Sequence, residues 1–331
     1  MQPVLLEPNT PPTFYRGGGR IDRLRGTSGH EDRPEDWIAS VTARFGQAPD
    51  GMTRLPDGQL LADAVAADPV GWLGAEHVAR YGSDTGLLVK LLDAGQRLPV
   101  HVHPDRGFAA EHLASPHGKT EAWIVLEAER DAGVHLGFSR DVGAAELAGW
   151  VRDQDVESLL AVTHRLPIAA GDVVLCPAGT PHAISAGVFL VELQEPTDLS
   201  ILMEWRDFGL PAAAATLGLP LEEALACVDR RAFPPERLQA LRGRPLNGAV
   251  GSLLPGEADP FFVAERVDAR RDRHLTQSYG VLVVTAGEGR LTTENGGTRP
   301  LRRGSVVLIP HGAGAAELAG TVEGVRCLPA P

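Results

Sequence analysis

One nine-residue pattern occurs twice in this chain of 331 residues and constrains the fold more than any other feature. Residues 171–179 (GDVVLCPAG) and residues 304–312 (GSVVLIPHG) both read glycine, five residues, proline, any residue, glycine. In each copy, a glycine turn precedes a short apolar run that fits a buried strand, and a Pro-x-Gly turn ends it. Two copies of one strand unit predict two related β-barrel units.

The rest of the sequence also favours short elements, most of them strands. Its 38 glycines and 26 prolines supply the many turns that all-β barrels and sandwiches require. Short apolar runs between turn residues predict strands, and apolar spacings of three and four predict helices. The predicted strands are 36–40, 86–93, 98–103, 122–127, 171–176, 182–185 and 187–193, with more after 245. The predicted helical segments are 143–161, part of 59–81, and 217–242 with a break at 234–235.

Charge and cysteine content narrow the cellular setting. The net charge of −12 disfavours a nucleic-acid backbone or an anionic membrane surface as a partner. The three cysteines are far apart, which is typical of a reduced, intracellular protein without disulfides. The N-terminal segment does not read as a signal peptide, and no apolar run is long enough to span a bilayer. We therefore expect a cytoplasmic protein with no nucleic-acid or membrane partner, while the oligomeric state stays open.

Four side chains of metal-binding type lie at matched positions around the first copy of the pattern. His101 and His103 are two residues apart in a predicted strand, so both imidazoles point to one face. Glu121 begins the next predicted strand, and His182 follows the first Pro-x-Gly turn. Three imidazoles and one carboxylate suit one divalent transition metal and leave room for substrate or water. The second copy has Ala315 at the position of His182, so we expect the second unit to bind no metal.

The two half-motifs, GxxxxxHxH followed by Glu and GxxxxxPxGxxH, resemble those of the cupin superfamily. Within it, residues 86–127 resemble type I phosphomannose isomerases (mannose-6-phosphate isomerases), which share a His-Pro-Asp turn and then Gly-Lys-Thr-Glu-x-Trp. Residues 177–184 (PAGTPHAI) and 189–198 (FLVELQEPTD) extend the likeness. The resemblance implies an all-β fold with helical insertions and two cupin-type jelly-roll β-barrels, a bicupin-like arrangement. We expect a catalytic cupin with a helical insert in residues 1–215, and a helical segment plus a second, metal-free cupin-like jelly roll in residues 216–331.

The resemblance also implies a function. Members of this family are zinc-dependent aldose–ketose isomerases that interconvert mannose 6-phosphate and fructose 6-phosphate through a cis-enediol. The four ligands would then hold one divalent metal, zinc first, with manganese or iron as alternatives. Glu192 resembles the family's acid/base residue and is the first choice for proton transfer. Lys119 is expected to bind substrate or to stabilise the enediolate, and the expected partner is a sugar or a sugar phosphate.

Two positions depart from the family pattern. Leu202 stands where the family carries an arginine that contacts the substrate, and Pro99 stands where it tends to carry a serine used for phosphate. Neither side chain can make a charge-assisted hydrogen bond to phosphate. We therefore expect the chain to be a poor catalyst with mannose 6-phosphate.

Other polar residues near the motifs have weaker assignments. Asp105 could orient His103 by accepting a hydrogen bond from its ring. Arg106, His112 and His117 lie in the segment between the ligands and could reach a substrate. In the second copy, the histidine at position 311 is expected to be a loop residue and not a ligand.

Three alternative functions stay open. An isomerase or epimerase of an unphosphorylated sugar would keep the metal and Glu192, and would account for both departures. A cupin dioxygenase is the second alternative, because three imidazoles and one carboxylate on iron or manganese also suit oxygen activation. The third is a metal-bearing, sugar-binding protein without turnover.

Overall fold

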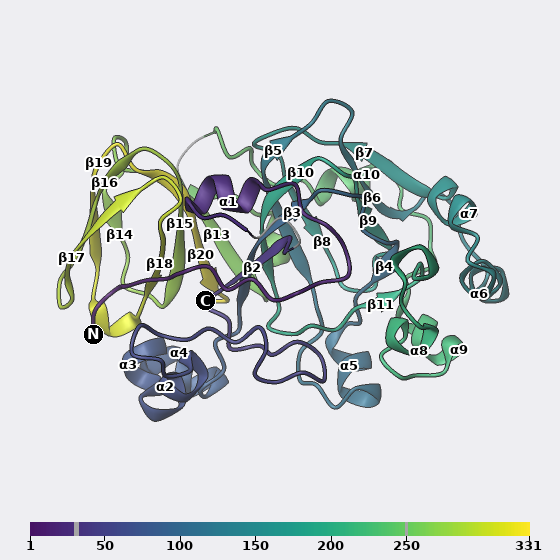
Figure 1. The fold of residues 1–331 in the computed structure, drawn as a ribbon, viewed down its shortest axis with the longest axis horizontal. Helices are drawn as coiled ribbons and strands as arrows, with labels where there is room; N and C mark the ends of the chain where they lie inside the picture. The colour runs from purple at the N-terminus through teal and green to yellow at the C-terminus, as the bar shows by residue number, and fades with distance from the viewer. Residues whose placement is uncertain (30–32, 249–250) are drawn as a thin grey trace.

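The computed structural model describes residues 1–29, 33–248 and 251–331. The described strands form four antiparallel sheets, with short helices between and around them (Figure 1). The strands of the C-terminal part lie at one end of the molecule, and helices α6 (Ala144–Asp153) and α7 (Val156–Ala161) lie at the other (Figure 1). The prediction of a mostly β fold with helices is confirmed.

Two five-stranded sheets carry the residues singled out above. The first has the order β2-β3-β10-β5-β8, and the second has the order β11-β4-β9-β6-β7. In sequence order, their bounds are β2 (Glu35–Ile38), β3 (Leu88–Ala94), β4 (His101–Val102), β5 (Glu121–Ala128), β6 (Gly133–Phe138), β7 (Thr163–Pro167), β8 (Val173–Cys176), β9 (His182–Ile184), β10 (Val188–Gln194) and β11 (Ile201–Leu202). Strand β8 belongs to the first copy of the repeated pattern and ends directly before Pro177, as predicted.

The C-terminal part holds a six-stranded and a four-stranded sheet, ordered β1-β18-β15-β20-β13-β12 and β14-β19-β16-β17. Their bounds are β1 (Val4–Leu5), β12 (Gly251–Ser252), β13 (Phe262–Asp268), β14 (His274–Leu275), β15 (Gly280–Ala286), β16 (Glu288–Thr293), β17 (Gly297–Arg302), β18 (Val306–Ile309), β19 (Ala316–Gly320) and β20 (Glu323–Pro329). Strand β18 belongs to the second copy of the pattern and pairs with the N-terminal strand β1.

The predicted helical segments are helical but interrupted. Segment 143–161 divides between α6 and α7 at Gln154, whose φ of 59° lies in the left-handed region. The predicted strand 98–103 is regular only in β4, since Pro99 has no N–H for a strand hydrogen bond. The other helices are α1 (Arg20–Arg25), α2 (Leu61–Ala67), α3 (Pro69–Leu73), α4 (Ala75–Tyr81), α5 (Arg106–His112), α8 (Ala212–Ala215), α9 (Leu221–Ala224) and α10 (Pro235–Ala240). In the described part of the chain, no helix has the length and apolar content needed to cross a membrane.

The side chains of strand β15 show which sheets pack against each other. Val281 and Val283 belong to a large apolar core that also contains Leu91 of β3, whereas Leu282 and Val284 belong to a core formed with the four-stranded sheet. Successive side chains of a strand point to opposite faces, so the six-stranded sheet is covered on both sides. Its outer face packs on the four-stranded sheet, and its inner face packs on the sheet that contains β3 and β10.

Candidate metal centre and active site

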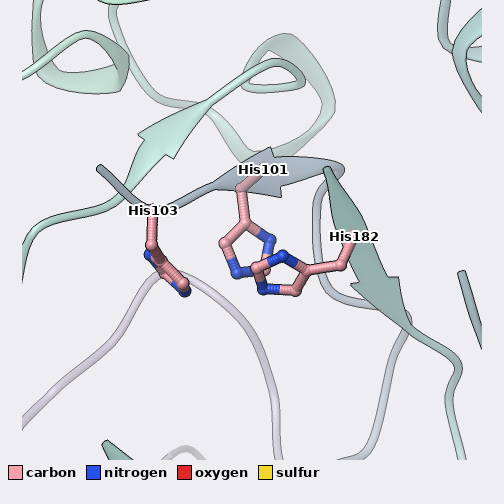
Figure 2. A group of neighbouring side chains, drawn as sticks. All are labelled: His101, His103 and His182. Atoms are coloured by element: carbon pink, nitrogen blue, oxygen red, sulfur yellow. The ribbon is translucent and has the colours of Figure 1, made fainter. Parts of the chain in front are cut away.

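His101 and His182 face each other across two neighbouring strands. Strands β4 and β9 pair with these residues directly opposite, and their ring centroids are 4.0 Å apart. His103 follows β4, and its ring centroid lies 4.9 Å from each of the other two. All three side chains are buried, and one nitrogen of each lies within 4.8 Å of the others (Figure 2). The structure therefore brings the three predicted histidines into one cluster.

Each imidazole has its Nδ1 fixed by a backbone carbonyl. The carbonyl oxygens of Pro99, Leu199 and Thr180 lie 2.8, 2.9 and 2.8 Å from Nδ1 of His101, His103 and His182, in that order. A carbonyl oxygen can only accept, so each Nδ1 carries the proton and donates it. Each Nε2 then keeps its lone pair, which is the orientation of a metal-ligating histidine.

Glu121, the first residue of β5, completes the cluster from the other five-stranded sheet. Its Oε1 lies 2.9 Å from Nε2 of His103, and its Oε2 lies 3.7 Å from Nε2 of His182. Within the described residues, both Nε2 atoms are buried and lack a hydrogen-bond partner. Buried polar atoms are costly to leave unsatisfied, and a cation between nitrogen and carboxylate would satisfy them. This donor set of nitrogen and oxygen atoms fits a divalent metal.

The protonation states also suit a metal. Burial lowers the pKa of His103 to about 3, and burial likewise lowers the pKa of His101 and of His182. Burial alone would raise the pKa of Glu121, but His103 and the ammonium of Lys119 hold it well below its usual range. Near neutral pH the cluster therefore presents neutral imidazoles and an ionised carboxylate, the forms in which these residues bind metals.

A row of buried polar groups continues from Glu121 along the first sheet. Nζ of Lys119 lies 3.0 Å from Oε1 of Glu121 and donates to Oγ of Ser200 at 3.4 Å. The indole N–H of Trp123 lies 3.2 Å from a carboxylate oxygen of Glu121 and 3.2 Å from one of Glu192. Trp123 therefore links the carboxylate at the histidine cluster to the carboxylate predicted to move protons.

Lys90 lies on the other side of Glu192, directly opposite it in the pairing of β3 and β10. Its Nζ is 3.9 Å from Oε2 of Glu192, 3.3 Å from Oε2 of Glu35, and 4.4 Å from the ring centroid of Trp37. Glu35 also accepts hydrogen bonds from the Tyr15 hydroxyl at 2.5 Å and from the Trp37 indole at 2.6 Å. Sequence analysis missed Lys90, although a single lysine inside an apolar run is a signal that a buried partner exists.

Glu192 differs from Glu35 and Glu121 in that its pKa is raised and theirs are lowered. Its pKa rises to about 8, because burial penalises the charged form and the negative charge of Glu121 adds to this effect more than Lys90 offsets it. A carboxyl group that titrates near neutral pH can both accept and release a proton under working conditions. Glu192 thus has the property required of a general acid/base.

A cavity of about 440 Å³ joins these groups and opens to solvent. Its size is that of an ordinary small-molecule site. The polar side chains of the row line it together with His101, and Asp198 and Ser200 lie beside them. The two predicted catalytic residues, Glu192 and Lys119, therefore line the same cavity as His101.

No model of a known protein family matches the sequence. The mannose-6-phosphate isomerase of Streptococcus mutans, however, is 27% identical over 333 residues, and the match covers 97% of this chain and 96% of the relative. This chain is similar to mannose-6-phosphate isomerases over nearly its whole length. The crystal structure of the Bacillus subtilis mannose 6-phosphate isomerase has the same fold, with a TM-score of 0.77, 22% identity and 99% coverage of both chains. A zinc-bound mannose 6-phosphate isomerase structure matches with a TM-score of 0.76, 17% identity and 100% coverage of both chains.

Both departures from the pattern of mannose-6-phosphate isomerases lie in the cavity wall. Leu202 pairs directly opposite His101 where β11 meets β4, and it is 5% exposed. Pro99 precedes His101 by two residues and also lines the cavity. The two substitutions therefore change the surface that a substrate meets next to the histidine cluster.

Asp105 does not orient His103, so that prediction is wrong. Its carboxylate accepts a hydrogen bond from the backbone N–H of Phe108 at 2.8 Å and caps helix α5. The Nδ1 of His103 is instead held by a backbone carbonyl, as described above. An aspartate three residues before a helical N–H is the sequence signal that favoured this capping role.

The remaining predicted residues lie outside the described cavity lining. Arg106, His112 and His117 each contact a carboxylate, on Glu195, Glu223 and Asp84 in that order. His311 lies in the short 3-10 helix η4 (His311–Ala313), where the amide of Gln277 donates to its Nδ1 at 3.3 Å.

Proposed function

We propose that this protein is a metal-dependent aldose–ketose isomerase of the mannose-6-phosphate isomerase type, acting on mannose 6-phosphate or a related aldose. One observation carries the proposal: in the buried cluster of His101, His103, His182 and Glu121, His101 and Glu121 line the same cavity as Glu192, a carboxyl group poised near neutral pH. The cluster would hold one divalent metal, zinc first and manganese or iron as alternatives. Similarity to a mannose-6-phosphate isomerase over nearly the whole chain supports the reaction type.

The proposal includes the division of the chain into two cupin-type jelly rolls, in residues 1–215 and 216–331. Two observations support it. The two copies of the repeated pattern form the equivalent strands β8 and β18. In addition, the six-stranded and four-stranded sheets enclose a core of their own.

A metal held by the four side chains would supply positive charge that polarises the substrate carbonyl and stabilises the enediolate oxygen. Glu192 removes the proton from C2 of the open-chain aldose, and the C–H electron pair forms the C1–C2 double bond of the cis-enediol. The carbonyl oxygen at C1 gains a proton. Glu192 then returns its proton to C1 while the hydroxyl at C2 loses one, which gives the ketose. No oxidant or reductant is consumed.

The other buried side chains position this proton transfer. The indole of Trp123 and the ammonium of Lys90 contact different oxygens of Glu192 and fix the plane of its carboxylate. The ammonium of Lys119, 5% exposed, is available to bind a substrate oxygen on the same side as Glu121. Because these groups are buried, bulk water has little access to the enediol, which favours return of the same proton.

A turnover experiment in D₂O tests the proposal. Purified protein of measured metal content is incubated with phosphorylated and free aldoses, and NMR follows ketose formation and deuterium at C1. We expect ketose formation that chelation abolishes and metal restores. Glu192→Gln is the matched variant, expected to bind metal and to lose isomerisation. Metal-loaded protein that forms no ketose from any aldose would contradict the proposal, and oxygen uptake with such substrates would favour the dioxygenase alternative.

A further inference from the structure

The strands that carry polar residues of the site also place apolar residues on the same face of the cavity. Side chains two positions apart in a strand share a face. Four such pairs lie at the cavity: Lys90 with Leu92, His101 with Pro99, His182 with Ile184, and Ser200 with Leu202. All of their members except His182 line the cavity. The cavity therefore has a polar part and an apolar part, side by side along the same strands.

The apolar residues on and beside the second sheet come from neighbouring segments and line the same cavity. Strands β11, β4 and β9 are neighbours in that sheet. Leu202 is opposite His101, and residues opposite each other in antiparallel strands have Cβ atoms about 4.5–5.5 Å apart. The backbone N–H of Leu98 donates to the carbonyl oxygen of Ile184 at 2.9 Å, which joins β9 to the segment before β4. We call Leu98, Pro99, Ile184 and Leu202 the apolar wall.

No cation is left unpaired in the described lining of the cavity. Its cationic side chains are Arg44, Lys90 and Lys119. They form ion pairs at 2.9, 3.3 and 3.0 Å with the carboxylates of Asp50, Glu35 and Glu121, in that order. A phosphate dianion would have to break one of these pairs and would leave a carboxylate beside itself. Anion recognition normally uses a guanidinium or ammonium that is free to make charge-assisted hydrogen bonds.

We propose that the apolar wall receives the end of the sugar remote from the reacting carbons, and that this end is uncharged. The substrate class is then an unphosphorylated aldose, with a 6-deoxyaldose preferred. The inference rests on the proposed function, because the histidine cluster and Glu192 must take the C1–C2 end. A hydroxyl against this wall loses its hydrogen bonds to water without new partners, whereas a methyl group gains by leaving water.

The outer lining of the cavity is consistent with this preference. Phe14 and Phe45 line the cavity and are 39% and 47% exposed, so they lie where it meets solvent. Leu210 and Leu217 lie in the same lining. A phenylalanine side chain offers a flat apolar face to the C–H groups of a sugar and no donor to a phosphate.

Three aldoses that differ only at C6 test the inference: 6-deoxy-D-mannose, D-mannose and D-mannose 6-phosphate. With metal-loaded wild-type protein, we expect kcat/KM to fall in that order, by at least about tenfold from first to last, the factor that corresponds to about 1.4 kcal/mol. Leu202→Arg is expected to raise kcat/KM for the phosphorylated sugar at least tenfold and to lower it for the 6-deoxy sugar. Leu202→Met, which keeps the wall apolar, is the matched control and should preserve the wild-type order.

The outcomes separate this inference from the proposed function. A wild-type preference for mannose 6-phosphate over both uncharged sugars would overturn the inference and leave the isomerase function intact. Failure of the metal-loaded protein to convert any of the three sugars, or other aldoses, would overturn the proposed function itself. The wild-type ranking decides the question even if the arginine variant fails to fold.

Discussion

Replacing Lys90 with methionine removes the one ammonium between Glu35 and Glu192 and nearly keeps the side-chain length. The Lys90 side chain is 3% exposed, and its Nζ lies 3.3 Å from Glu35. In the variant, Glu35 keeps the hydrogen bonds from Tyr15 and Trp37 but loses its closest cation. A carboxylate left in the interior without a counter-charge takes up a proton, so its pKa rises.

The size of the effect follows from the cost of that protonation. At pH 7, holding a group of ordinary pKa 4.5 in its neutral form costs about 3 kcal/mol, at about 1.4 kcal/mol per pH unit. Removing one partner of a buried ion pair typically costs about 3–5 kcal/mol, which agrees. Because the folded variant binds one more proton than the unfolded chain above pH 4.5, its stability falls as pH rises. We therefore expect Lys90→Met to lose about 3 kcal/mol at pH 7 and about 1.4 kcal/mol less at pH 6.

Urea unfolding of wild type and variant at pH 5, 6 and 7, each with and without metal, measures this loss. The double variant Lys90→Met/Glu35→Gln is expected to recover most of it, because the carboxylate that loses its closest cation is removed together with that cation. A loss below about 1 kcal/mol at pH 7, or a loss that does not change with pH, would refute the reasoning.

Three further predictions concern the metal and the proton transfer. His182→Ala is expected to lower bound metal from about one ion per chain to near zero, whereas His311→Ala, in the equivalent turn of the second pattern, should keep it; equal metal content by elemental analysis would contradict the proposed site. Glu192→Gln is expected to lower kcat about 10²- to 10⁴-fold. In the wild type, activity should rise with pH as the Glu192 carboxyl group, with a pKa of up to about 8, loses its proton, and the variant should lack this rise. An unchanged pH profile would assign the base to another residue. Trp123→Phe removes an N–H donor to Glu192, so the pKa of that carboxyl group should rise and the increase of activity with pH should move to higher pH. If that increase stays at the wild-type pH, the indole does not position Glu192.

Local spacing allowed the histidine cluster to be predicted from the sequence. Side chains two residues apart in a strand point to the same face of the sheet, whatever the rest of the fold. His101 and His103 were therefore expected to point the same way. The Pro-x-Gly turn set the start of the strand that carries His182. Glu121 could be included because it begins a strand of its own, and the packing of the two five-stranded sheets places it beside His103.

Lys90 could not be placed from the sequence because its strand is covered on both faces. A half-buried strand alternates between polar and apolar residues, and that alternation marks its inner face. Strand β3 is buried at every position from Leu88 to Ala94, so the pattern predicts a strand but no direction for the lysine. Only the pairing of β3 with β10, which joins distant parts of the chain, shows that Lys90 and Glu192 are opposite each other.

The division of the helical segment at 154 was also beyond sequence reasoning. Gln154 has no special freedom for a left-handed backbone, which glycine or asparagine would have signalled. In the structure its side-chain amide donates to the carbonyl oxygen of Val151 at 2.7 Å, and its oxygen accepts from the backbone N–H of Trp205 at 2.8 Å. The contact with Trp205, 51 residues later in the chain, helps to hold the break, and no local pattern encodes it.

The two five-stranded sheets contribute different kinds of side chain to the cavity. Glu192, Lys90 and Glu121 lie on the first sheet, whereas the apolar wall lies on and beside the second, and the histidine cluster joins the two. A substitution in the wall therefore changes what the remote end of a substrate meets, while the groups proposed to move the proton keep their partners on another sheet. This separation gives a physical reason why the apolar wall, Leu202 included, can vary while the proposed metal ligands and the proposed acid/base residue keep their contacts. It also explains why the three sugars that differ at C6 form the decisive series, since they vary the group at the wall and leave the reacting carbons unchanged.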